Sequence, residues 1–567
     1  MFWYSMVFAL LLAAACLWVW RAYGPVDTRI MPDYGADKPV FYEGVALEGT
    51  AVGSGDALKL PLPMIQAAID ESATFEEASK SVILTTDSRV VRLATEQLTA
   101  WVNDRPFELR FPTETIDGVV YVPAEPLERF YGVRLDEAAD TGFVTLRKPG
   151  DVTAWVSVPE PDESADASAA PVPARLEPTV RSAIVGELAP GERAAVWGEA
   201  AGWYRVQLPN GAVGYAEKTA LRWNGTETYA PETDERFAPY VPKRPMGEKI
   251  QLTWEQVYNR NPDTSAIGPM PGVNVVSPTW FHVMDETGAL ENRADKSYSK
   301  WAHGRGYQVW AIFTNDFDPD LTSAVLASYD VRMNMARQLL GFAELYELDG
   351  INVDFENVHV KDGPALTQFM RELTPLLHEA GLTVSIDVTF ASGSENWSMF
   401  YDRRALGAIV DYMMIMAYDE HWASSPVAGS VASLPWVEDG VRRIIEDHGV
   451  PADKIVLGVP FYTRIWTEEP SDQGGAKVSS KAVGMDAVER LIAEKGLKPT
   501  FDEATGQHYV EYEEDGAVKK IWIEDETSMR SRAALVGELG LAGIASWSRN
   551  FASADIWTVI DETLRSR

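Results

Sequence analysis

The chain has 567 residues, of which 46% are hydrophobic, and a formal charge of -34. This length and apolar content predict several folded domains, and the acidic balance excludes a nucleic-acid partner, because phosphates require a basic surface. The single cysteine, Cys16, excludes an intramolecular disulfide. Residues 17–281 contain neither Cys nor His, which argues against a zinc or copper site in that part of the chain.

The N-terminal segment is apolar. Residues 2–20 contain only Ser5 as a polar residue, and as a helix they would reach roughly 29 Å, about the thickness of a bilayer core. No basic residue precedes Arg21, whereas a cleavable signal normally has a basic start. We therefore expect residues 1–22 to be a membrane anchor, with a cleaved signal as the alternative. Either interpretation fits an extracytoplasmic, membrane-anchored or secreted protein.

An internal repeat follows, with a spacing of 62 residues. Residues 55–84 align without gaps on residues 117–146, and each copy reads as a strand, a Pro, a short helix and a closing strand. The pair resembles the small duplicated α+β module named after the N-terminal domain of copper amine oxidases, which we expect over residues 38–148. The name implies no copper chemistry, since the ligands are absent, and a structural or wall-facing spacer is the simpler interpretation.

Two Pro-rich stretches flank a second small module. Residues 149–174 are rich in Pro, Ala, Asp and Ser, which predicts a linker, and a second linker is predicted at 224–245. Between them, residues 175–223 alternate β-prone runs with turn signals. This segment resembles the bacterial Src-homology-3-like (SH3-like) modules, which are small β-barrels, and the resemblance implies contact with the cell wall. Trp203 and Tyr204 could form a binding platform there or belong to the core.

Strands and helical stretches alternate over residues 246–567, which predicts an α/β fold of the (β/α)8 TIM-barrel type. In such barrels the functional groups lie at the carboxyl ends of the strands. The stretch 466–523 is too long for a plain loop and predicts a small inserted α+β subdomain. The expected strands are 273–277, 308–314, 350–355, 383–389, 412–417, 455–459 and 543–547, with a weak eighth strand near 287–290.

The stretch 348–357, Leu-Asp-Gly-Ile-Asn-Val-Asp-Phe-Glu-Asn, is the most informative part of the chain. It reads as a buried strand, and alternation places Asn352, Asp354 and Glu356 on one face. Polar groups on a buried strand are costly unless they line a cavity or bind each other. Neighbouring carboxyl groups also raise each other's pKa, which keeps one of them protonated and able to protonate a leaving group. The alternative is a strand end whose acids cap a helix or pair with Arg.

Three other predicted strand ends carry aromatic, acidic and basic side chains that could line a cleft. Each one alone is more simply explained as packing at the barrel rim. Their occurrence in order, behind the acidic stretch, favours a common cleft. The residues are Tyr418, Asp419, His421 and Trp422 after the sixth strand, Tyr462 and Arg464 after the seventh, and Trp547 at the end of the eighth.

The acidic stretch resembles the signature of glycoside hydrolase family 18, Asp-x-x-Asp-x-Asp-x-Glu. Asp349, Asp354 and Glu356 match it, whereas Asn352 replaces the middle acid. The resemblance covers about 246–567, includes the Met-x-Tyr-Asp segment, and is nearest to the bacterial branch with spore-cortex and cell-wall glucosaminidases. It implies a retaining mechanism in which the 2-acetamido group of the sugar is the nucleophile, without a cofactor or a metal.

The resemblance also implies roles for single residues. Glu356 would be the general acid and then the base, Asp354 would hold the acetamido N–H, and Tyr418 would donate to the acetamido oxygen. Asn352 could donate an amide hydrogen to Asp354, which would keep Asp354 ionised and able to raise the pKa of Glu356. Trp547 would form the floor beneath the sugar. The other expected substrate-binding residues are Asp349, Asn352, Asp419, Tyr462, Arg464, His421 and Trp422.

Three functions follow as hypotheses. The first is an extracytoplasmic N-acetylglucosaminidase that cleaves peptidoglycan, held at the wall by the SH3-like module and at the membrane by residues 2–20. The second is a chitinase or chito-oligosaccharide hydrolase with the same residues. The third is a catalytically silent wall-binding protein. The module and the anchor favour the first over the second, and Glu356 speaks against the third, because binding alone does not need a protonated acid.

Overall fold

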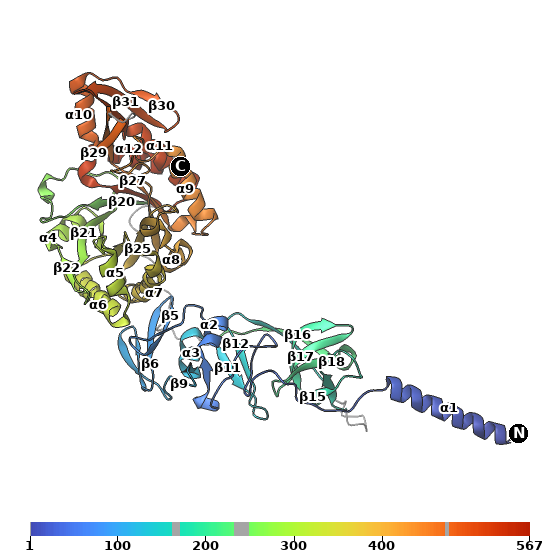
Figure 1. Ribbon diagram of the computed structural model, residues 1–567. Helices are drawn as coiled ribbons and strands as arrows, with labels where there is room; N and C mark the ends of the chain where they lie inside the picture. Colours follow the sequence, from blue (N-terminus) through green and yellow to red (C-terminus); the bar gives the residue numbers. More distant parts are fainter. Residues whose placement is uncertain (1, 161–169, 232–248, 471–475, 567) are drawn as a thin grey trace. The chain divides into compact units, whose positions relative to one another are not determined.

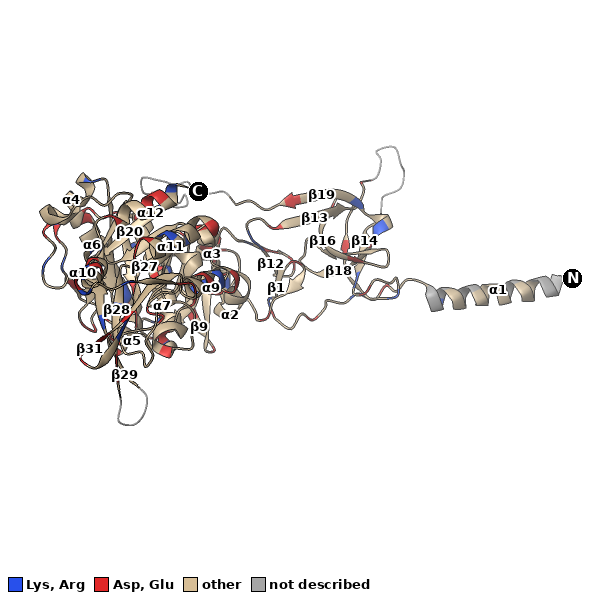
Figure 2. Cartoon of the chain, turned by 90° about the horizontal axis from the view of Figure 1, so that it is seen from above, with Lys and Arg blue, Asp and Glu red and all other residues tan. Residues whose placement is uncertain are grey.

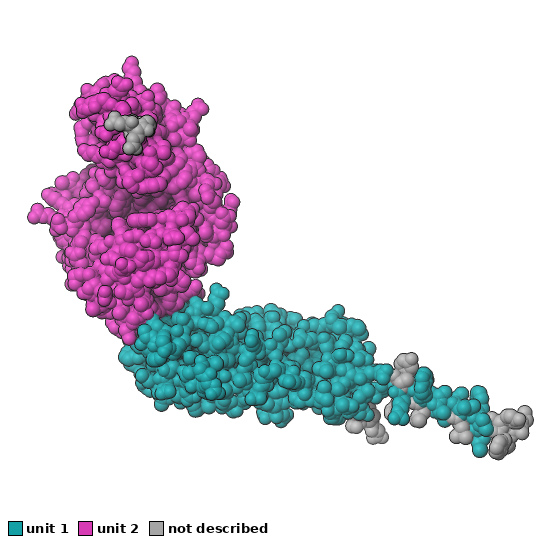
Figure 3. Space-filling view, viewed as in Figure 1, with its two compact units in different colours: residues 1–86, 91–238 teal, residues 87–90, 239–567 magenta. Residues whose placement is uncertain are grey.

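The computed structural model describes residues 2–160, 170–231, 249–470 and 476–566 (Figure 1). It divides into two compact units, residues 1–86 with 91–238 and residues 87–90 with 239–567 (Figure 3). Figure 2 shows Lys and Arg interspersed with Asp and Glu in both units, so the net negative charge is spread along the chain.

Residues Phe2–Tyr23 form helix α1. Within the described part of the chain, no helix combines the length and the apolar character needed to cross a membrane. The predicted membrane segment at residues 2–20 is therefore not supported.

The repeat in the first unit forms a symmetric strand pair. Strands β3 (Lys59–Pro61) and β10 (Val119–Pro123) pair antiparallel, and Leu60 pairs with Val122, its own counterpart at the 62-residue spacing. Each strand runs into a short helix whose N-cap is a Pro, α2 (Leu62–Ala68) and α3 (Ala124–Tyr131). Pro suits a helix start because its missing N–H would have no partner there.

The other strands of this module form two further sheets, and β9 (Glu114–Ile116) joins β10 and β3. One sheet has the order β11-β12-β1-β2, and the other runs from β4 to β8 in sequence order. Their bounds are β1 (Val40–Tyr42), β2 (Val45–Ala46), β11 (Arg134–Glu137), β12 (Val144–Arg147), β4 (Thr74–Glu76), β5 (Ser81–Thr86), β6 (Arg89–Ala94), β7 (Thr99–Val102) and β8 (Arg105–Glu108).

The second module is a seven-stranded sheet of order β15-β14-β18-β17-β16-β13-β19. Its core includes Phe41 and Phe143 from the first module, so the two modules share one hydrophobic cluster. Trp203 is buried, whereas Tyr204 is half-buried and packs against the exposed ring of Trp223. The strands are β13 (Val152–Ser157), β14 (Val172–Arg175), β15 (Ile184–Leu188), β16 (Arg193–Ala200), β17 (Trp203–Gln207), β18 (Val213–Glu217) and β19 (Arg222–Thr228).

Three strands of this sheet fall within or overlap the two ranges that were predicted to be linkers. Strand β13 and the first three residues of β14 lie inside the range 149–174, and β13 pairs with β16 and β19. Residues 152–157 (Val-Thr-Ala-Trp-Val-Ser) have β-prone side chains that outweigh the surrounding Pro and Asp. The Asp- and Ser-rich part, 161–169, lies outside the described residues. Strand β19 likewise covers the start of the range 224–245, and the rest of that range from residue 232 is not described.

The second unit contains a closed barrel of eight parallel strands in the order β20-β33-β27-β26-β25-β24-β23-β21, with β20 also paired to β21. The predicted barrel is thus confirmed, but its first strand is β20 and not the segment near 287–290. Strand β22 (Leu290–Asn292) instead pairs antiparallel with the end of β21. The barrel strands are β20 (Ile250–Glu255), β21 (Val275–Val283), β23 (Gln308–Thr314), β24 (Gly350–Asp354), β25 (Thr383–Val388), β26 (Tyr412–Met416), β27 (Ile455–Pro460) and β33 (Gly543–Trp547).

Large side chains fill the inside of the barrel. Trp254, Trp310, Tyr412 and Met414 belong to one buried cluster, in which the rings of Trp310 and Tyr412 stack with centroids 5.6 Å apart. The barrel is therefore a packed core, and space for a substrate is left only at a strand end. Helices follow the strands: α4 (Lys296–Gly304), α5 (Pro319–Leu326), α6 (Tyr329–Tyr346), α7 (Gly363–Glu379), α8 (Arg403–Ile409), α9 (Leu434–Glu446), α11 (Glu526–Glu538) and α12 (Ile556–Arg565).

An α+β subdomain is inserted between β27 and β33, as the sequence predicts. Its antiparallel sheet has the order β29-β28-β32-β31-β30, and its own apolar cluster is built around Val488, Val510 and Ile521. The elements are β28 (Tyr462–Pro470), β29 (Ala476–Gly484), α10 (Met485–Lys495), β30 (Thr500–Asp502), β31 (Gln507–Glu514) and β32 (Ala517–Ile523).

Candidate active site

Strand β24 brings two of the predicted acids to the carboxyl end of the barrel. Asn352 pairs across the sheet with Ile312, which belongs to the barrel core, so the face that carries Asn352 and Asp354 points inward. Asp354 is buried, and its burial raises the pKa of the carboxyl group to about 7. Glu356 follows the strand end, where burial, together with the charges of Asp354 and Asp419, raises its pKa well above the ordinary value. Two carboxyl groups at this end are thus held toward their protonated forms.

The backbone beside Glu356 is clamped by a neighbouring strand end. Asn315, the residue after β23, accepts a hydrogen bond from the Glu356 N–H at 3.1 Å and donates one to its carbonyl oxygen at 2.7 Å. The hydroxyl of Tyr401 donates to the carbonyl oxygen of Phe355 at 2.8 Å. Sequence reasoning assigned no role to Asn315 or Tyr401. Only the position of Asn315, directly after a barrel strand, could have singled it out.

Asn352 does not bond to Asp354, contrary to the prediction. Its amide nitrogen donates to Oδ2 of Asp387 at 2.7 Å, and its carbonyl oxygen accepts from the hydroxyl of Ser385 at 2.6 Å. Both partners lie on β25, because a side chain inside the barrel reaches the neighbouring strand more readily than the residue two positions along its own strand. Burial, and then the charge of Asp354, raises the pKa of Asp387 well above its ordinary value. Asp387 is a third buried acid, which the sequence analysis did not single out.

Asp349 lies at the wrong end of the strand for a substrate-binding residue. It precedes β24, and five residue-to-residue steps of about 3.3 Å each separate it from Asp354. Its Oδ2 is bonded to Nε2 of His303 at 2.9 Å and accepts the Val309 N–H at 2.9 Å. The family signature includes Asp349, but here its carboxylate holds the amino-terminal edge of the barrel together.

The sixth and seventh strand ends meet in a small polar cluster. Oδ1 of Asp419 accepts from the hydroxyl of Tyr462 at 2.7 Å and from Nη2 of Arg464 at 2.9 Å. The ring of Tyr418 lies edge-on to those of Trp254 and Tyr462, with centroids 6.5 and 6.3 Å apart. Burial and the nearby carboxyl groups raise the pKa of the Tyr418 phenol well above its ordinary value, so it remains a hydrogen-bond donor. These four residues therefore do lie together, as the sequence predicts.

The three remaining predicted residues differ in exposure and in hydrogen bonding. They are Trp547, His421 and Trp422. Trp547 is partly exposed and lies over the barrel core, 5.9 Å from Trp254 between ring centroids. Trp422 is exposed, and its indole N–H donates to the hydroxyl of Ser424 at 3.1 Å. His421 is bonded through Nδ1 to the carbonyl oxygen of Ser430 at 2.8 Å. The His421 ring is thus bonded within its own loop, whereas the exposed surfaces of Trp422 and Trp547 are accessible to a ligand.

The loop between β26 and α9 is fastened to the inserted subdomain. The Trp466 indole donates to the carbonyl oxygen of Gly429 at 2.8 Å, and the hydroxyl of Ser430 donates to Gln507. Arg532 of α11, which is 1% exposed, donates to the carbonyl oxygen of Ala432 and is paired with Glu524. The subdomain therefore positions the loop that carries Asp419 and Trp422.

An exposed aromatic pair adjoins the acidic motif. The rings of Phe317 and Trp397, which are 44% and 45% exposed, lie with centroids 6.2 Å apart. Asn357, the residue after Glu356, donates to the carbonyl oxygen of Phe317 at 2.7 Å and accepts from Asn396 at 3.3 Å. Sequence reasoning missed this pair, because neither ring follows a strand directly.

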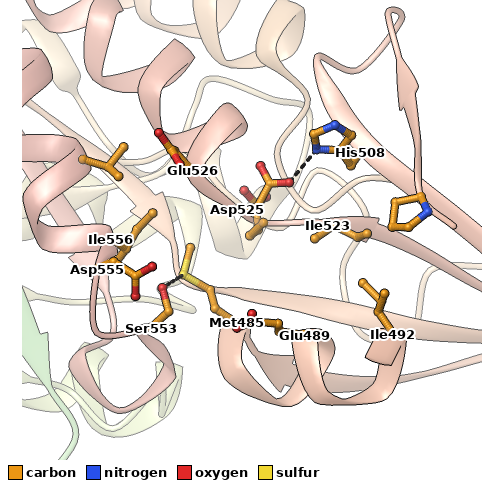
Figure 4. Close-up of a pocket in the computed structure, with 13 residues that line it drawn as sticks. Met485, Glu489, Ile492, His508, Ile523, Asp525, Glu526, Ser553, Asp555 and Ile556 are labelled. Atoms are coloured by element: carbon orange, nitrogen blue, oxygen red, sulfur yellow. Dashed lines mark hydrogen bonds and ion pairs between the residues drawn. The ribbon is translucent and has the colours of Figure 1, made fainter. Parts of the chain in front are cut away.

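A separate cavity of about 540 Å³ lies where the inserted subdomain meets α11 and α12 (Figure 4). His508 and Asp525 are hydrogen-bonded on its wall, with Nδ1 and Oδ2 2.6 Å apart. None of the predicted site residues is among the described residues that line it. The described side chains also include no group of three or more His, Cys, Asp or Glu placed to hold a metal ion. The carboxyl cluster at the end of β24 and β25 is thus the best-supported candidate site.

The chain matches three family models. Residues 307–552 match glycosyl hydrolases family 18, a range that contains β23 to β33 and all the predicted site residues. Residues 42–146 match the copper amine oxidase N-terminal domain, and residues 172–221 match the bacterial SH3 domain. The family 18 match begins after β20 and β21, the two barrel strands nearest the start of the unit.

Similar proteins include an uncharacterized glycosylase of Bacillus subtilis, YvbX, which is 24% identical over 300 residues, 51% of this chain and 84% of the relative. A cortical fragment-lytic enzyme of Bacillus anthracis is 27% identical over 44% of this chain and 58% of its own length, so the chain spans little more than half of that relative. The crystal structure of a chitinase from Chromobacterium violaceum is 26% identical, with a TM-score of 0.50 over 56% of this chain and 100% of that structure.

The closed barrel of parallel strands agrees in fold with the chitinase structure, and the family 18 match covers the strand that carries the acids. The second unit of the chain therefore contains a glycosyl hydrolases family 18 domain over residues 307–552, and the protein is a glycosidase.

Proposed function

We propose that this glycosidase cleaves N-acetylglucosamine-containing glycan, with peptidoglycan as its substrate, by a retaining mechanism in which the substrate's acetamido group is the nucleophile. The observation that carries the proposal is the pair formed by Glu356 and Asp354. Both have raised pKa values, and Oδ1 of Asp354 is buried without a hydrogen-bond partner among the described residues. A buried acceptor without a partner is costly, so an N–H donor supplied by a substrate would offset that cost.

Glu356 is the proton donor in this scheme. Its proton passes to the glycosidic oxygen as the bond from that oxygen to C1 breaks, and the acetamido oxygen bonds to C1 to give a cyclic oxazolinium. Water then attacks C1 while Glu356 takes a proton from it, which reopens the ring with retained configuration. The raised pKa of Glu356 supports the first step, because a general acid must be protonated at the working pH.

Asp354 and Tyr418 serve the acetamido group. The unpartnered Oδ1 of Asp354 would accept the acetamido N–H, and the ionised carboxylate would stabilise the positive charge of the oxazolinium. The phenol of Tyr418, which stays protonated because of its burial, would donate to the acetamido oxygen. These roles require an ionised Asp354 beside a protonated Glu356, a division that their coupled titration allows.

Exposed rings around the acids fit a long substrate. Trp547 would lie beneath the reacting sugar, and Asp419, fixed by Tyr462 and Arg464, would accept from a sugar hydroxyl. Apolar groups that stay exposed beside a cleft are typical of ligand-binding surfaces. Trp422 on one loop and the Phe317–Trp397 pair on another would therefore contact neighbouring sugars.

Two observations favour peptidoglycan over chitin. Among the relatives are enzymes named for the lysis of cortical fragments, and the first unit contains a match to the bacterial SH3 domain, which we take as the wall-binding part of the chain. Both support an extracytoplasmic place of action. Chitin or chito-oligosaccharides remain the second candidate, since the barrel also resembles a chitinase.

The test is to digest purified peptidoglycan and purified chitin separately and to identify the new reducing ends by mass spectrometry. We expect N-acetylglucosamine at the new reducing ends of peptidoglycan and slower release from chitin, with both reactions lost in Glu356→Gln. Faster release from chitin would replace the proposed substrate with the second candidate.

The mechanism has its own test. A substrate with a free 2-amino group has no carbonyl oxygen to attack C1, so it should bind but scarcely react. A thiazoline that mimics the cyclic intermediate should inhibit competitively and bind more tightly than substrate. Equal turnover of acetylated and deacetylated substrates would rule out the acetamido group as the nucleophile.

A further inference from the structure

Asp354 and Asp387 are direct neighbours across two parallel strands. Val353 of β24 pairs with Ile386 of β25, so the next residues in register are Asp354 and Asp387. Adjacent strands lie about 4.8 Å apart, and residues in register point to the same face of a sheet. Both side chains therefore point into the barrel, and both are buried, with 8% and 2% of their surface exposed.

The hydrogen bonds of the two carboxyl groups are incomplete in the same way. Oδ2 of Asp387 accepts from Asn352, but Oδ1 of Asp387 and Oδ1 of Asp354 are buried without a partner among the described residues. Two unpartnered acceptors side by side repel each other if both groups are ionised. A single proton between them would give each oxygen a partner and would leave the pair with one negative charge.

Among the described residues, the titratable groups that face the pair are an acid and two phenols, and none of these three is a cation. Glu356, two residues beyond the end of β24, adds a third acid, and the phenols of Tyr418 and Tyr401 face the cluster from the next strand end and the next loop. The Tyr401 hydroxyl already donates to Phe355. Arg403, beside Tyr401, donates to the carbonyl oxygens of Thr389 and Ser398.

We propose that Asp387 is a positioning residue that shares one proton with Asp354 and retains that proton when Asp354 accepts the substrate's N–H. Asn352 fixes the far oxygen of Asp387 and so turns the other oxygen toward Asp354. The acid that the signature places on β24 is thus supplied by β25. This inference rests on the proposed function of Asp354.

The test detects the proton shared by Asp354 and Asp387 through infrared spectra, and it does not require a substrate. In the full-length Glu356→Gln protein, which lacks the Glu356 titration, infrared difference spectra between pH 5 and pH 8 should contain a carboxylic-acid carbonyl band from the pair. Adding Asp387→Asn should remove that band over this range, because the new amide donates to Asp354 and favours its ionised form. Ser385→Ala in the same background is the matched control, since it breaks the bond to Asn352 without removing an acid, and it should keep the band.

A second double variant, Glu356→Gln with Asp354→Asn, removes the other acid of the pair and should also lose the band. It keeps the test decisive if the Asp387 variant fails to fold.

Stability gives a second readout. A proton held only by the native state makes the unfolding equilibrium constant rise about tenfold per pH unit, and Asp387→Asn should abolish this part of the slope. A band that persists in both double variants would overturn the proposal. Failure of the proposed function would appear separately, as an absence of glycan cleavage by the wild-type enzyme.

Discussion

The two ends of strand β24 carry acids of the same signature in opposite situations. Asp349, at the amino end, is bonded to the ring of His303 and to a backbone N–H, and 31% of its side chain is exposed. Asp354, at the carboxyl end, is buried, and its Oδ1 has no hydrogen-bond partner in the part of the chain that the structure describes. A carboxylate whose donors come from its own chain stabilises the fold, whereas one that lacks them is ready for a donor from outside. The contrast shows that matching a signature does not by itself give a residue a role in catalysis.

The largest expected effect comes from the acid beyond the carboxyl end. Glu356→Gln keeps the shape and removes the transferable proton, so kcat should fall by about 10²–10⁴-fold on an unactivated glycan. Asp349→Asn, the matched change at the amino end, should leave kcat within about threefold. Steady-state rates of both purified proteins check this, and a Glu356→Gln enzyme with near-normal turnover would remove Glu356 from its proposed role.

The second effect concerns stability and pH. The pKa of Asp354 is about 7 in the folded protein and about 4 in the unfolded chain, so the folded state binds the proton more tightly. Stability is therefore lost as the pH rises from about 4 to about 7. Asp354→Asn should remove this loss and stabilise the protein at pH 8 by up to about 4 kcal/mol, with little change at pH 4. Urea unfolding at the two pH values measures it, and an equal effect at both would contradict the assignment.

At the amino end of β24, removing the acid should destabilise the protein instead of stabilising it. Asp349→Ala removes the acceptor of the Val309 N–H and the partner of His303, which should cost about 1–2 kcal/mol of stability at pH 7. Activity per folded molecule should stay near that of the wild type. Urea unfolding and an active-site titration together separate the two quantities. A large loss of kcat without a loss of stability would return Asp349 to the active site.

The smallest effect tests how far the cleft extends from the carboxyl end. Trp397→Ala should raise KM for a long glycan about fivefold, which corresponds to about 1 kcal/mol of lost contact, with kcat nearly unchanged. A disaccharide substrate, too short to reach the ring, serves as the internal control. If KM rose equally for both substrates, the ring would contact the reacting sugar or support the fold.

Much of this arrangement could be predicted from the sequence because it depends on local patterns. Strands β23 and β33 have the predicted bounds, and β24, β25 and β26 differ by one residue at their ends. Strand β20 was missed because its alternate residues Gln251 and Thr253 are polar, although both are buried where strands close the barrel.

The site itself was predicted less completely, for a reason that lies in the pairing of strands. The hydrogen bond from Asn352 to Asp387 joins residues 35 positions apart and depends on the register of β24 against β25. The clamp from Asn315 onto Glu356 likewise spans 41 positions. No periodicity within one strand contains that information. The sequence could nevertheless predict one cluster, because parallel strands all have their carboxyl ends at the same edge of the barrel. This cluster contains Tyr418, Asp419, Tyr462 and Arg464.

The bonds that tie the inserted subdomain to the β26–α9 loop matter for anyone who wants to exchange parts between barrels. Gln507 and Trp466 belong to the insertion, but Arg532, which completes the same network, comes from α11 after the insertion has ended. A graft cut at residues 462 and 523 would leave the carbonyl oxygen of Ala432 without its guanidinium donor. A transferable cassette must therefore extend through α11, and a new specificity built on this loop has to be selected together with that helix.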